Sequence, residues 1–419
     1  MGLDRFPVIA AEVAKAPPCE SVCLAVGPQR SLVINGKHLA STYDRTAEAE
    51  TQALTIPKDA TEAWVYGHAL GDCIAQLLLR GQTRTDLTED DRTKLEKVHV
   101  VVMSRSITKV VAEFDKCTWL DSPRVELHLA RDLDRVHTPF CVSPVEMFHC
   151  DEDAEPLRDR LTILLNAEFN ETNMAARRHI ELAQYEANKP AIEKDGFVTR
   201  LFAGEGLPAI VIGGGPTLSE SYDWIRERAD LHTIICASTA LWPLMRAGIV
   251  PDVVMVIDPA PDIAKHFRGL DLTPLKDSTL VYIPSTFPEV VRLWTGPRAC
   301  ASIVMGHDGD LFSGGTVAHS AVDLACRMGA REVHLLGLDF SYPGDASHVD
   351  GARSPFLVAG QSQAWREKTT NGLGERVTTS AEMVQYRRVA EDMIRERPGV
   401  KFYKRGRRGV PLAGAEWAD

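Results

Sequence analysis

Three consecutive glycines follow an apolar run near the middle of the chain. The run 209–212 (AIVI) has the composition of a strand buried on both faces, and the turn after it is Gly213-Gly214-Gly215-Pro216-Thr217. Glycines at a strand end let the backbone approach a ligand closely, and the amides that open the next helix can bind a phosphate. The spacing is neither G-x-G-x-x-G nor that of a P-loop. The alternative is a tight turn in which Thr217 caps the helix.

Two further segments place small polar residues at the start of a helical pattern. Gly314-Gly315-Thr316 is a second candidate anion site, with a simple helix cap as the alternative. Ser238 follows the apolar run 232–236 and opens another helical pattern. Its hydroxyl can hold a base or a ribose, and pure capping of the helix is the alternative.

Acidic residues follow two of the strand-like runs. Asp258 comes after the run 252–257 and Asp339 after the run 332–336. A carboxylate at the carboxyl end of a parallel strand can bind ribose hydroxyls, a divalent metal or a catalytic partner. Asp262 lies close to Asp258, so this pair is a candidate for Mg²⁺, although Asp262 is better explained as a helix cap.

His348 lies in a polar loop after the last of these strands, where it can reach the same edge of the sheet. A histidine at such a place suits a general base or a partner for phosphate. The alternative is an ordinary loop histidine.

These candidates depend on strands that alternate with helices. In the second half of the chain, strand patterns cover 209–212, 232–236, 252–257, 279–283, 301–305 and 332–336, with helical patterns between them. The alternation predicts an α/β fold with a Rossmann-like, doubly wound parallel sheet, and ligands at the carboxyl ends of its strands. Beyond it we expect a helix over 381–396 and a last strand over 401–403.

The N-terminal part shows the same alternation on a smaller scale. Strand patterns at 31–34, 63–66 and 98–103 alternate with helical patterns at 43–55, 73–80 and 107–114. We therefore predict a smaller Rossmann-like α/β domain over 1–150 and a helical connector over 151–200, with Pro190 and Gly196 marking its exit. The Rossmann-like catalytic domain is expected over 201–355. The residues 356–419 are expected to form a loop or lid and a helix that returns to the core.

Composition excludes several classes of protein. The chain has 419 residues, with 47 Lys+Arg and 58 Asp+Glu, so its net charge is −11. An acidic chain is unsuited to general nucleic-acid binding, which needs a basic surface. Nine scattered cysteines without C-x-x-C spacing favour free thiols over a disulfide framework or a zinc cage. With neither a leader-like start nor an apolar run long enough for a bilayer, we expect a soluble cytoplasmic protein without a membrane span.

At these residues the chain resembles the motility accessory factor (Maf) glycosyltransferases. That family shares a domain with hydroxymethylpterin diphosphokinase (MptE)-like proteins and is similar to bacterial sialyltransferases. The resemblance covers about 207–351 and is carried by the motifs IVIGGGPTL (210–218), GIVPD (248–252), IDP (257–259), GGTV (314–317), GLD (337–339) and SH (347–348).

The resemblance implies a transferase that moves a nonulosonic acid, pseudaminic or legionaminic in type. The donor would be the CMP-activated sugar, and the acceptor a Ser or Thr hydroxyl of a protein such as flagellin. By the same analogy the glycine turns at 213–215 and 314–315 contact the CMP donor. Asp258 and Asp339 would line the cleft, and His348 would lie near the reacting phosphate or hydroxyl. Backbone amides and a cation can stabilise the departing phosphate, so no metal is assigned.

Two alternatives remain open at this stage. The first is ATP- and Mg²⁺-dependent pyrophosphoryl transfer to a pterin, with Mg²⁺ at Asp258 and Asp262. The second is a non-catalytic scaffold of two Rossmann-like units. An NAD-dependent enzyme is disfavoured, because the glycine spacing differs and the second strand ends in CAST (236–239) instead of an acidic residue. The sequence does not indicate an oligomeric state.

Overall fold

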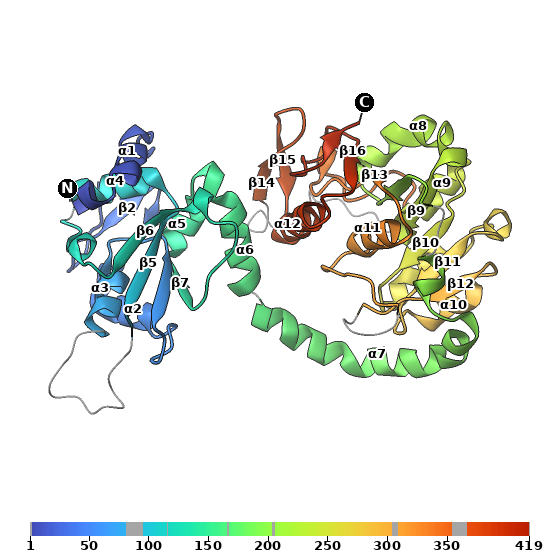
Figure 1. The fold of residues 1–419 in the computed structure, drawn as a ribbon, viewed down its shortest axis with the longest axis horizontal. Coiled ribbons are helices and arrows are strands. Elements are labelled where there is room, and N and C mark those ends of the chain that lie inside the picture. The colour runs from blue at the N-terminus through green and yellow to red at the C-terminus, as the bar shows by residue number, and fades with distance from the viewer. Residues whose placement is uncertain are drawn as a thin grey trace. The chain divides into compact units, whose positions relative to one another are not determined.

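The computed structural model describes residues 2–80, 95–114, 116–165, 167–202, 206–303, 309–353 and 367–418. It divides into two compact units, Met1–Asn166 and Ala167–Asp419. Both are α/β units built on parallel sheets (Figure 1).

The second unit contains an eight-stranded parallel sheet, in the order β12-β11-β10-β9-β8-β13-β16-β17. The strands are β8 (Ala209–Ile212), β9 (Thr233–Ala237), β10 (Val253–Val256), β11 (Thr279–Tyr282), β12 (Arg298–Cys300), β13 (Glu332–Leu336), β16 (Lys401–Lys404) and β17 (Glu416–Trp417). This sheet confirms the predicted Rossmann-like, doubly wound α/β fold.

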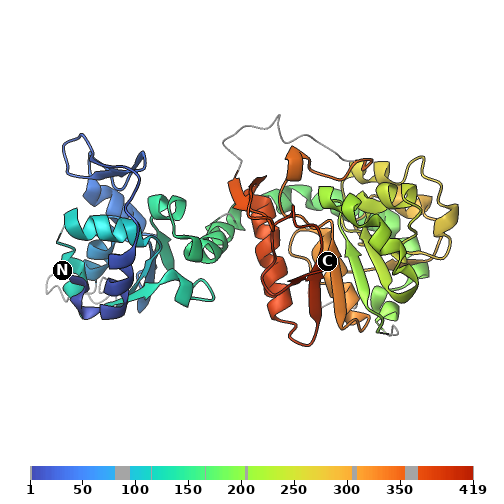
Figure 2. The ribbon, with the colours of Figure 1, turned by 90° about the horizontal axis from the view of Figure 1, so that it is seen from above.

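Helices cover both faces of this sheet. Alternate strand residues point to opposite faces, so Val211 packs with α11 (Val317–Arg327) and α12 (Ala381–Arg395). Ile212 packs on the other face with α9 (Ser238–Arg246), α10 (Pro288–Leu293) and the 3₁₀ helix η9 (Pro261–His266). Figure 2 shows α12, drawn in red, on one side of the sheet.

The remaining elements of this unit are mostly short helices. They are α7 (Ala167–Asp195), η6 (Val198–Leu201), η7 (Pro216–Ser221), α8 (Tyr222–Arg226), η8 (Ala229–Leu231), η10 (Thr273–Leu275) and η11 (Pro343–Asp345). The prediction that Pro190 marks the exit of the connector is wrong, because α7 continues through this residue to Asp195. Near this proline, the side-chain amide of Asn188 donates to the carbonyl of Thr286 at 2.7 Å and so holds the end of α7 against the rest of the second unit.

Two predicted strand boundaries near the edges of the sheet can be compared with the structure. The strand expected over 301–305 is displaced: β12 ends at Cys300, because its partner β11 pairs only as far as Tyr282 opposite Cys300. Residues 304 and 305 lie outside the described residues. The strand expected over 401–403 is confirmed as β16.

The segment expected to be a loop or lid is described only in part. Its residues 356–366 lie outside the described ranges. After them, β14 (Glu367–Thr370) and β15 (Arg376–Thr379) form an antiparallel hairpin. The predicted returning helix is confirmed as α12.

The first unit has a four-stranded parallel sheet in the order β6-β5-β4-β7. Its strands are β4 (Glu62–Tyr66), β5 (Lys97–Val102), β6 (Val125–Leu129) and β7 (Phe140–Val142); β1 (Val22–Leu24), β2 (Leu32–Ile34) and β3 (Lys37–His38) form a small antiparallel sheet. Its helices are η1 (Gly2–Arg5), α1 (Pro7–Lys15), α2 (Arg45–Ala53), α3 (Asp72–Arg80), α4 (Arg105–Phe114), η3 (Thr118–Asp121), η4 (Ala130–Asp132), α5 (Pro144–Phe148), η5 (Glu152–Ala154) and α6 (Glu155–Leu165). The sequence analysis found β4 and β5 but missed β6 and β7. Within the ranges given above, no helix has the length and apolar character needed to cross a bilayer.

Candidate functional site

The order of the strands defines a topological switch point in the second unit. From β8 the chain builds β9 to β12 on one side, and it then returns to place β13 on the other side of β8. The connections that leave β8 and β13 therefore run in opposite directions. In open α/β sheets, ligands bind outside the carboxyl ends of the strands at such a switch point.

The glycine turn after β8 lies directly against the turn after β13. The amide of Gly213 donates to the carbonyl of Leu336 at 2.8 Å, and that of Gly215 donates to Gly337 at 2.9 Å. A Cβ on Gly213 would lie 2.6 Å from the Gly337 carbonyl oxygen, so only glycine permits this approach. Two of the amides expected to face a phosphate are thus engaged within the protein.

Asp339 fastens the same turn from the other strand. Its Oδ2 accepts a hydrogen bond from the Thr217 amide at 2.9 Å, and its Oδ1 accepts one from the Thr217 hydroxyl. The side chain is buried, and a Cβ on Gly409 would lie only 2.8 Å from Oδ1. Because this carboxylate is enclosed and hydrogen-bonded, the geometry assigns Asp339 to positioning the turn.

A buried lysine compensates the charge of Asp339. Burial raises the pKa of Asp339, while the Lys404 ammonium and the hydrogen bonds from Thr217 act against that rise. Burial lowers the pKa of Lys404 to about 8, and the Asp339 carboxylate opposes this. Lys404 also donates to the carbonyl of Leu338. The buried Lys404 ammonium thus stabilises both the Asp339 carboxylate and the backbone just after β13.

The middle glycine of the turn meets the predicted histidine. The Gly214 carbonyl accepts a hydrogen bond from the Val349 amide at 2.8 Å, which holds the following loop against the turn. A Cβ on Gly214 would lie 2.7 Å from Thr239 Oγ1 and 3.1 Å from His348 Cδ2. The structure therefore brings His348 to the glycine turn at the switch point.

The imidazole of His348 is held by its neighbour in the chain. Its Nδ1 lies 3.0 Å from the Ser347 hydroxyl. Burial lowers the pKa of His348, and the nearby Lys265 ammonium lowers it further. The ring is therefore neutral near pH 7, the state that can accept a proton.

A second histidine joins this site, and the sequence analysis missed it. His266 is 3% exposed, and its Nδ1 lies 3.0 Å from the hydroxyl of Ser238. Burial lowers the pKa of His266 to about 4, with further contributions from Lys265 and His348. Ser238 thus faces an imidazole as well as opening α9. The sequence could have indicated Lys265 and His266 as site residues, because both lie in the segment that follows the carboxyl end of β10.

The aspartate pair considered for Mg²⁺ is engaged locally. Asp258 is exposed, and its Oδ1 accepts a hydrogen bond from the Ala260 amide at 2.8 Å. Asp262 forms an ion pair with Lys265 at 2.7 Å, which lowers the pKa of the Asp262 carboxyl. A metal at this pair would have to compete with the Lys265 ammonium.

The second glycine turn packs against a different element. A Cβ on Gly314 would collide with Val389 of α12, and Gly315 has a φ of 97° beside Tyr386. Thr316 is the residue before α11, and its side chain makes no capping hydrogen bond. The contacts of this turn are therefore with α12, whereas those of the first turn are with β13 and His348.

These features define an α/β protein with glycine turns, a buried aspartate and two histidines at the switch point of a doubly wound sheet. Residues 184–345 match the model of the family described as 6-hydroxymethylpterin diphosphokinase MptE-like. The matched segment includes β8 to β13 and ends just before His348. No curated protein matches the chain.

Among solved structures, the chain is similar to the MAf glycosyltransferase from Magnetospirillum magneticum AMB-1. The identity is 14% and the TM-score 0.44, over 100% of this chain and 73% of that one. A likeness of this degree fixes neither an activity nor a ligand for the present chain.

Proposed function

We propose that this protein is a glycosyltransferase that binds a CMP-activated nonulosonic acid at the carboxyl ends of β8 and β13. The acceptor in this proposal is a Ser or Thr hydroxyl of a protein such as flagellin. The observation that carries it is the position of His348 against Gly214, with Lys265, His266 and Ser238 beside them. Sugar transfer from a nucleotide needs a base that accepts the proton of the acceptor hydroxyl and a cation that stabilises the leaving phosphate, and both groups are present at this end of the sheet.

His348 is the general base in this reaction. In the tautomer whose Nδ1–H donates to Ser347, Nε2 carries the lone pair. It takes the proton of the acceptor hydroxyl as the new bond between that oxygen and the anomeric carbon forms. The bond from the anomeric carbon to the phosphate oxygen breaks, and its electron pair leaves with CMP.

Lys265 is the residue that would stabilise the negative charge of the leaving phosphate. Burial lowers the pKa of both His266 and His348, and the positive charge of Lys265 lowers each pKa further. A cation in this place balances the charge that develops on CMP without a proton transfer. The release of Lys265 from Asp262 would accompany donor binding.

Pyrophosphoryl transfer from ATP–Mg²⁺ to a pterin is the second candidate, and the matched family description favours it. That chemistry requires carboxylates that hold Mg²⁺ beside the phosphates. Asp258 and Asp262 would have to give up the Ala260 amide and the Lys265 ammonium for this purpose. For this reason we rank it below glycosyl transfer.

Ligand-dependent thermal unfolding separates the two activities and the scaffold alternative. A ligand at one hundred times its Kd stabilises the native state by about 2.7 kcal/mol. We expect CMP to raise the Tm without added metal, and Gly214→Ala to reduce that rise. A rise with ATP–Mg²⁺ alone would support the diphosphokinase. The absence of a rise with either nucleotide would support a scaffold.

The acceptor can be sought directly by mass spectrometry. Candidate proteins are co-expressed with this chain and a pathway that makes a CMP-activated nonulosonic acid. We expect Ser or Thr residues to gain the mass of the sugar with the wild-type chain and much less with His348→Gln. Equal modification with both chains would contradict the role of His348.

A further inference from the structure

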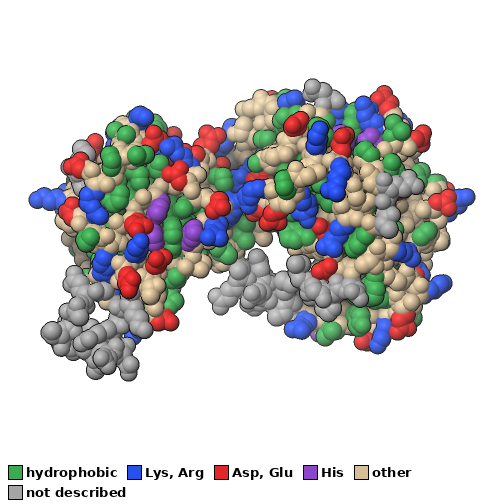
Figure 3. All heavy atoms as spheres, viewed as in Figure 1, with side chains coloured by type: hydrophobic (Ala, Val, Ile, Leu, Met, Phe, Trp, Pro, Cys, Tyr) green, Lys and Arg blue, Asp and Glu red, His purple; other side chains and the backbone are tan. Residues whose placement is uncertain are grey.

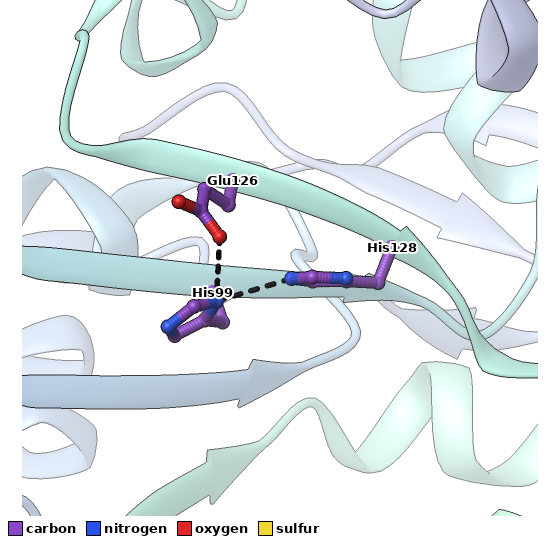
Figure 4. A group of neighbouring side chains, drawn as sticks. All are labelled: His99, Glu126 and His128. Carbon is purple, nitrogen blue, oxygen red and sulfur yellow. Dashed lines mark hydrogen bonds and ion pairs between the residues drawn. The ribbon is translucent and has the colours of Figure 1, made fainter. Parts of the chain in front are cut away.

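Two histidines and a glutamate meet on one face of the sheet in the first unit (Figure 4). Nδ1 of His99 on β5 lies 3.1 Å from Nε2 of His128 and 3.4 Å from Oε2 of Glu126, both on β6. His99 is directly opposite Glu126 in the parallel pairing of β5 with β6. Glu126 and His128 are two residues apart on one strand and therefore share a face.

The separations of these atoms suit a common metal ion. Zinc binds imidazole nitrogen and carboxylate oxygen at about 2.0–2.1 Å, so two ligand atoms on a tetrahedral ion lie about 3.3 Å apart. The distances from His99 Nδ1 to its two neighbours are close to that value. Two imidazoles and one carboxylate are also a ligand set that zinc uses in proteins.

The surroundings of His99 fix the ring in the orientation that such a site needs. Its Nε2 lies 3.5 Å from Oε2 of Glu62, and the atom is buried without a hydrogen-bond partner among the described residues. With Nδ1 on a metal, Nε2 must carry the proton, and the Glu62 carboxylate is the acceptor beside it. The Trp64 ring stacks on the imidazole at 4.2 Å with an interplanar angle of 11°.

Both signs of charge surround the cluster, and the Lys97 ammonium binds only one oxygen of Glu126. Lys97 is 2.7 Å from Oε1 of Glu126, which leaves Oε2 facing the histidines. Figure 3 shows histidines among acidic and basic side chains on the visible face of this unit.

We propose that His99, Glu126 and His128 bind a divalent transition-metal ion of the zinc type, with Glu62 as the acceptor that orients His99. Three protein ligands leave a fourth position for water or another small oxygen ligand. The ion joins β5 to β6 and thereby stabilises the first unit. The competing explanation is a proton shared between His99 and His128, and metal binding would replace that proton.

A second group, His232, Glu332 and His334 in the other unit, has the same composition. It is less suited to a cation, because the Arg228 guanidinium lies 4.4 Å from the centroid of the Trp224 ring, which adjoins His334. This second group serves as an internal comparison in the test.

The test uses the full chain, stripped of metal with a chelator and titrated with Zn²⁺ in a calorimeter. We expect one equivalent to bind at the first cluster, with Kd raised at least about tenfold by Glu126→Gln and by His128→Gln. Glu62→Gln should raise Kd by roughly 10–100-fold, as expected for a group that orients a ligand. His38→Gln, on the exposed strand β3, is the matched control and should leave Kd unchanged.

Two further readouts separate loss of the metal from loss of the fold. Circular dichroism checks that each variant is folded, and Co²⁺ in place of Zn²⁺ reports tetrahedral coordination by its visible absorption. Zn²⁺ should raise the Tm of the wild-type chain but not of Glu126→Gln. The proposal is overturned if the wild-type chain binds no stoichiometric Zn²⁺. It is also overturned if the double variant Glu126→Gln, His128→Gln still binds Zn²⁺. The same holds if Zn²⁺ binding is lost only in the double variant His232→Gln, His334→Gln.

Discussion

The Asp339 carboxylate accepts hydrogen bonds from both the amide and the hydroxyl of Thr217, although the two residues are 122 positions apart in the sequence. This contact joins the carboxyl ends of β8 and β13. The connections that follow these two strands run in opposite directions along the sheet. The glycine turn is thereby held in one conformation before any ligand arrives. Such preorganisation lowers the free-energy cost of binding.

Asp339→Asn tests this contact. The asparagine side chain has one oxygen and therefore accepts only one of the two hydrogen bonds that Thr217 donates. One buried donor of Thr217, either its N–H or its O–H, then loses its acceptor. We expect the free energy of unfolding to fall by about 1–3 kcal/mol, measured by urea denaturation. Asp230→Asn on the exposed surface is the control. Equal destabilisation by the two variants would contradict the positioning role of Asp339.

Gly214→Ala tests the approach of His348 to the turn. The added Cβ would displace the side chains of Thr239 and His348. We expect CMP binding, measured by calorimetry, to weaken at least about tenfold while the protein stays folded. Gly399→Ala is the matched control, since the nearest atom to its Cβ is 3.8 Å away. Unchanged CMP affinity in Gly214→Ala would argue against a donor site at this turn.

The pH dependence of turnover tests His348 as the base. Burial and Lys265 lower its pKa, so the neutral form persists below the ordinary histidine pKa near 6.5. Turnover of the CMP-sugar donor should therefore stay constant as the pH falls through 6.5 and should decline only below it. His348→Gln should reduce the rate by about 10²–10⁴-fold and remove this decline. A decline centred above pH 6.5 would be inconsistent with this assignment.

Two buried histidines predict an acid-sensitive second unit. Burial lowers the pKa of both His266 and His319 to about 4. Between that value and about 6.5 the unfolded chain binds more protons than the native state, so stability is complete above 6.5 and is lost on acidification. The slope should be about 1.4 kcal/mol per pH unit for each histidine.

The measurement is urea denaturation at several pH values from 7.5 to 5. His319→Gln keeps a donor for the Tyr386 carbonyl, which lies 2.9 Å from His319 Nε2, but it cannot titrate. We expect this variant to show a shallower loss of stability on acidification. An unchanged dependence of stability on pH would mean that the pKa of His319 does not differ between the native and the unfolded state.

The sequence was sufficient for the fold class and for much of the second unit. Short apolar runs separated by helical patterns predicted β8, β9, β10, β11 and β13 close to their observed positions. β6 was not predicted, because it alternates apolar residues with Glu126 and His128 and so lacks the continuous apolar run that marks the strands of the second unit. Those same residues are the ones that meet His99 in the structure.

Composition and local pattern by themselves determined an acidic α/β protein with glycine turns at strand ends and a histidine in the loop after β13. They did not determine which strand lies next to which, because that order results from packing between residues far apart in the chain. Only the tertiary structure places β13 beside β8, encloses Asp339 against Thr217, and brings Ser238 and His266 together. It also decides the protonation states, since burial sets the pKa of each of these groups and the sequence does not reveal burial.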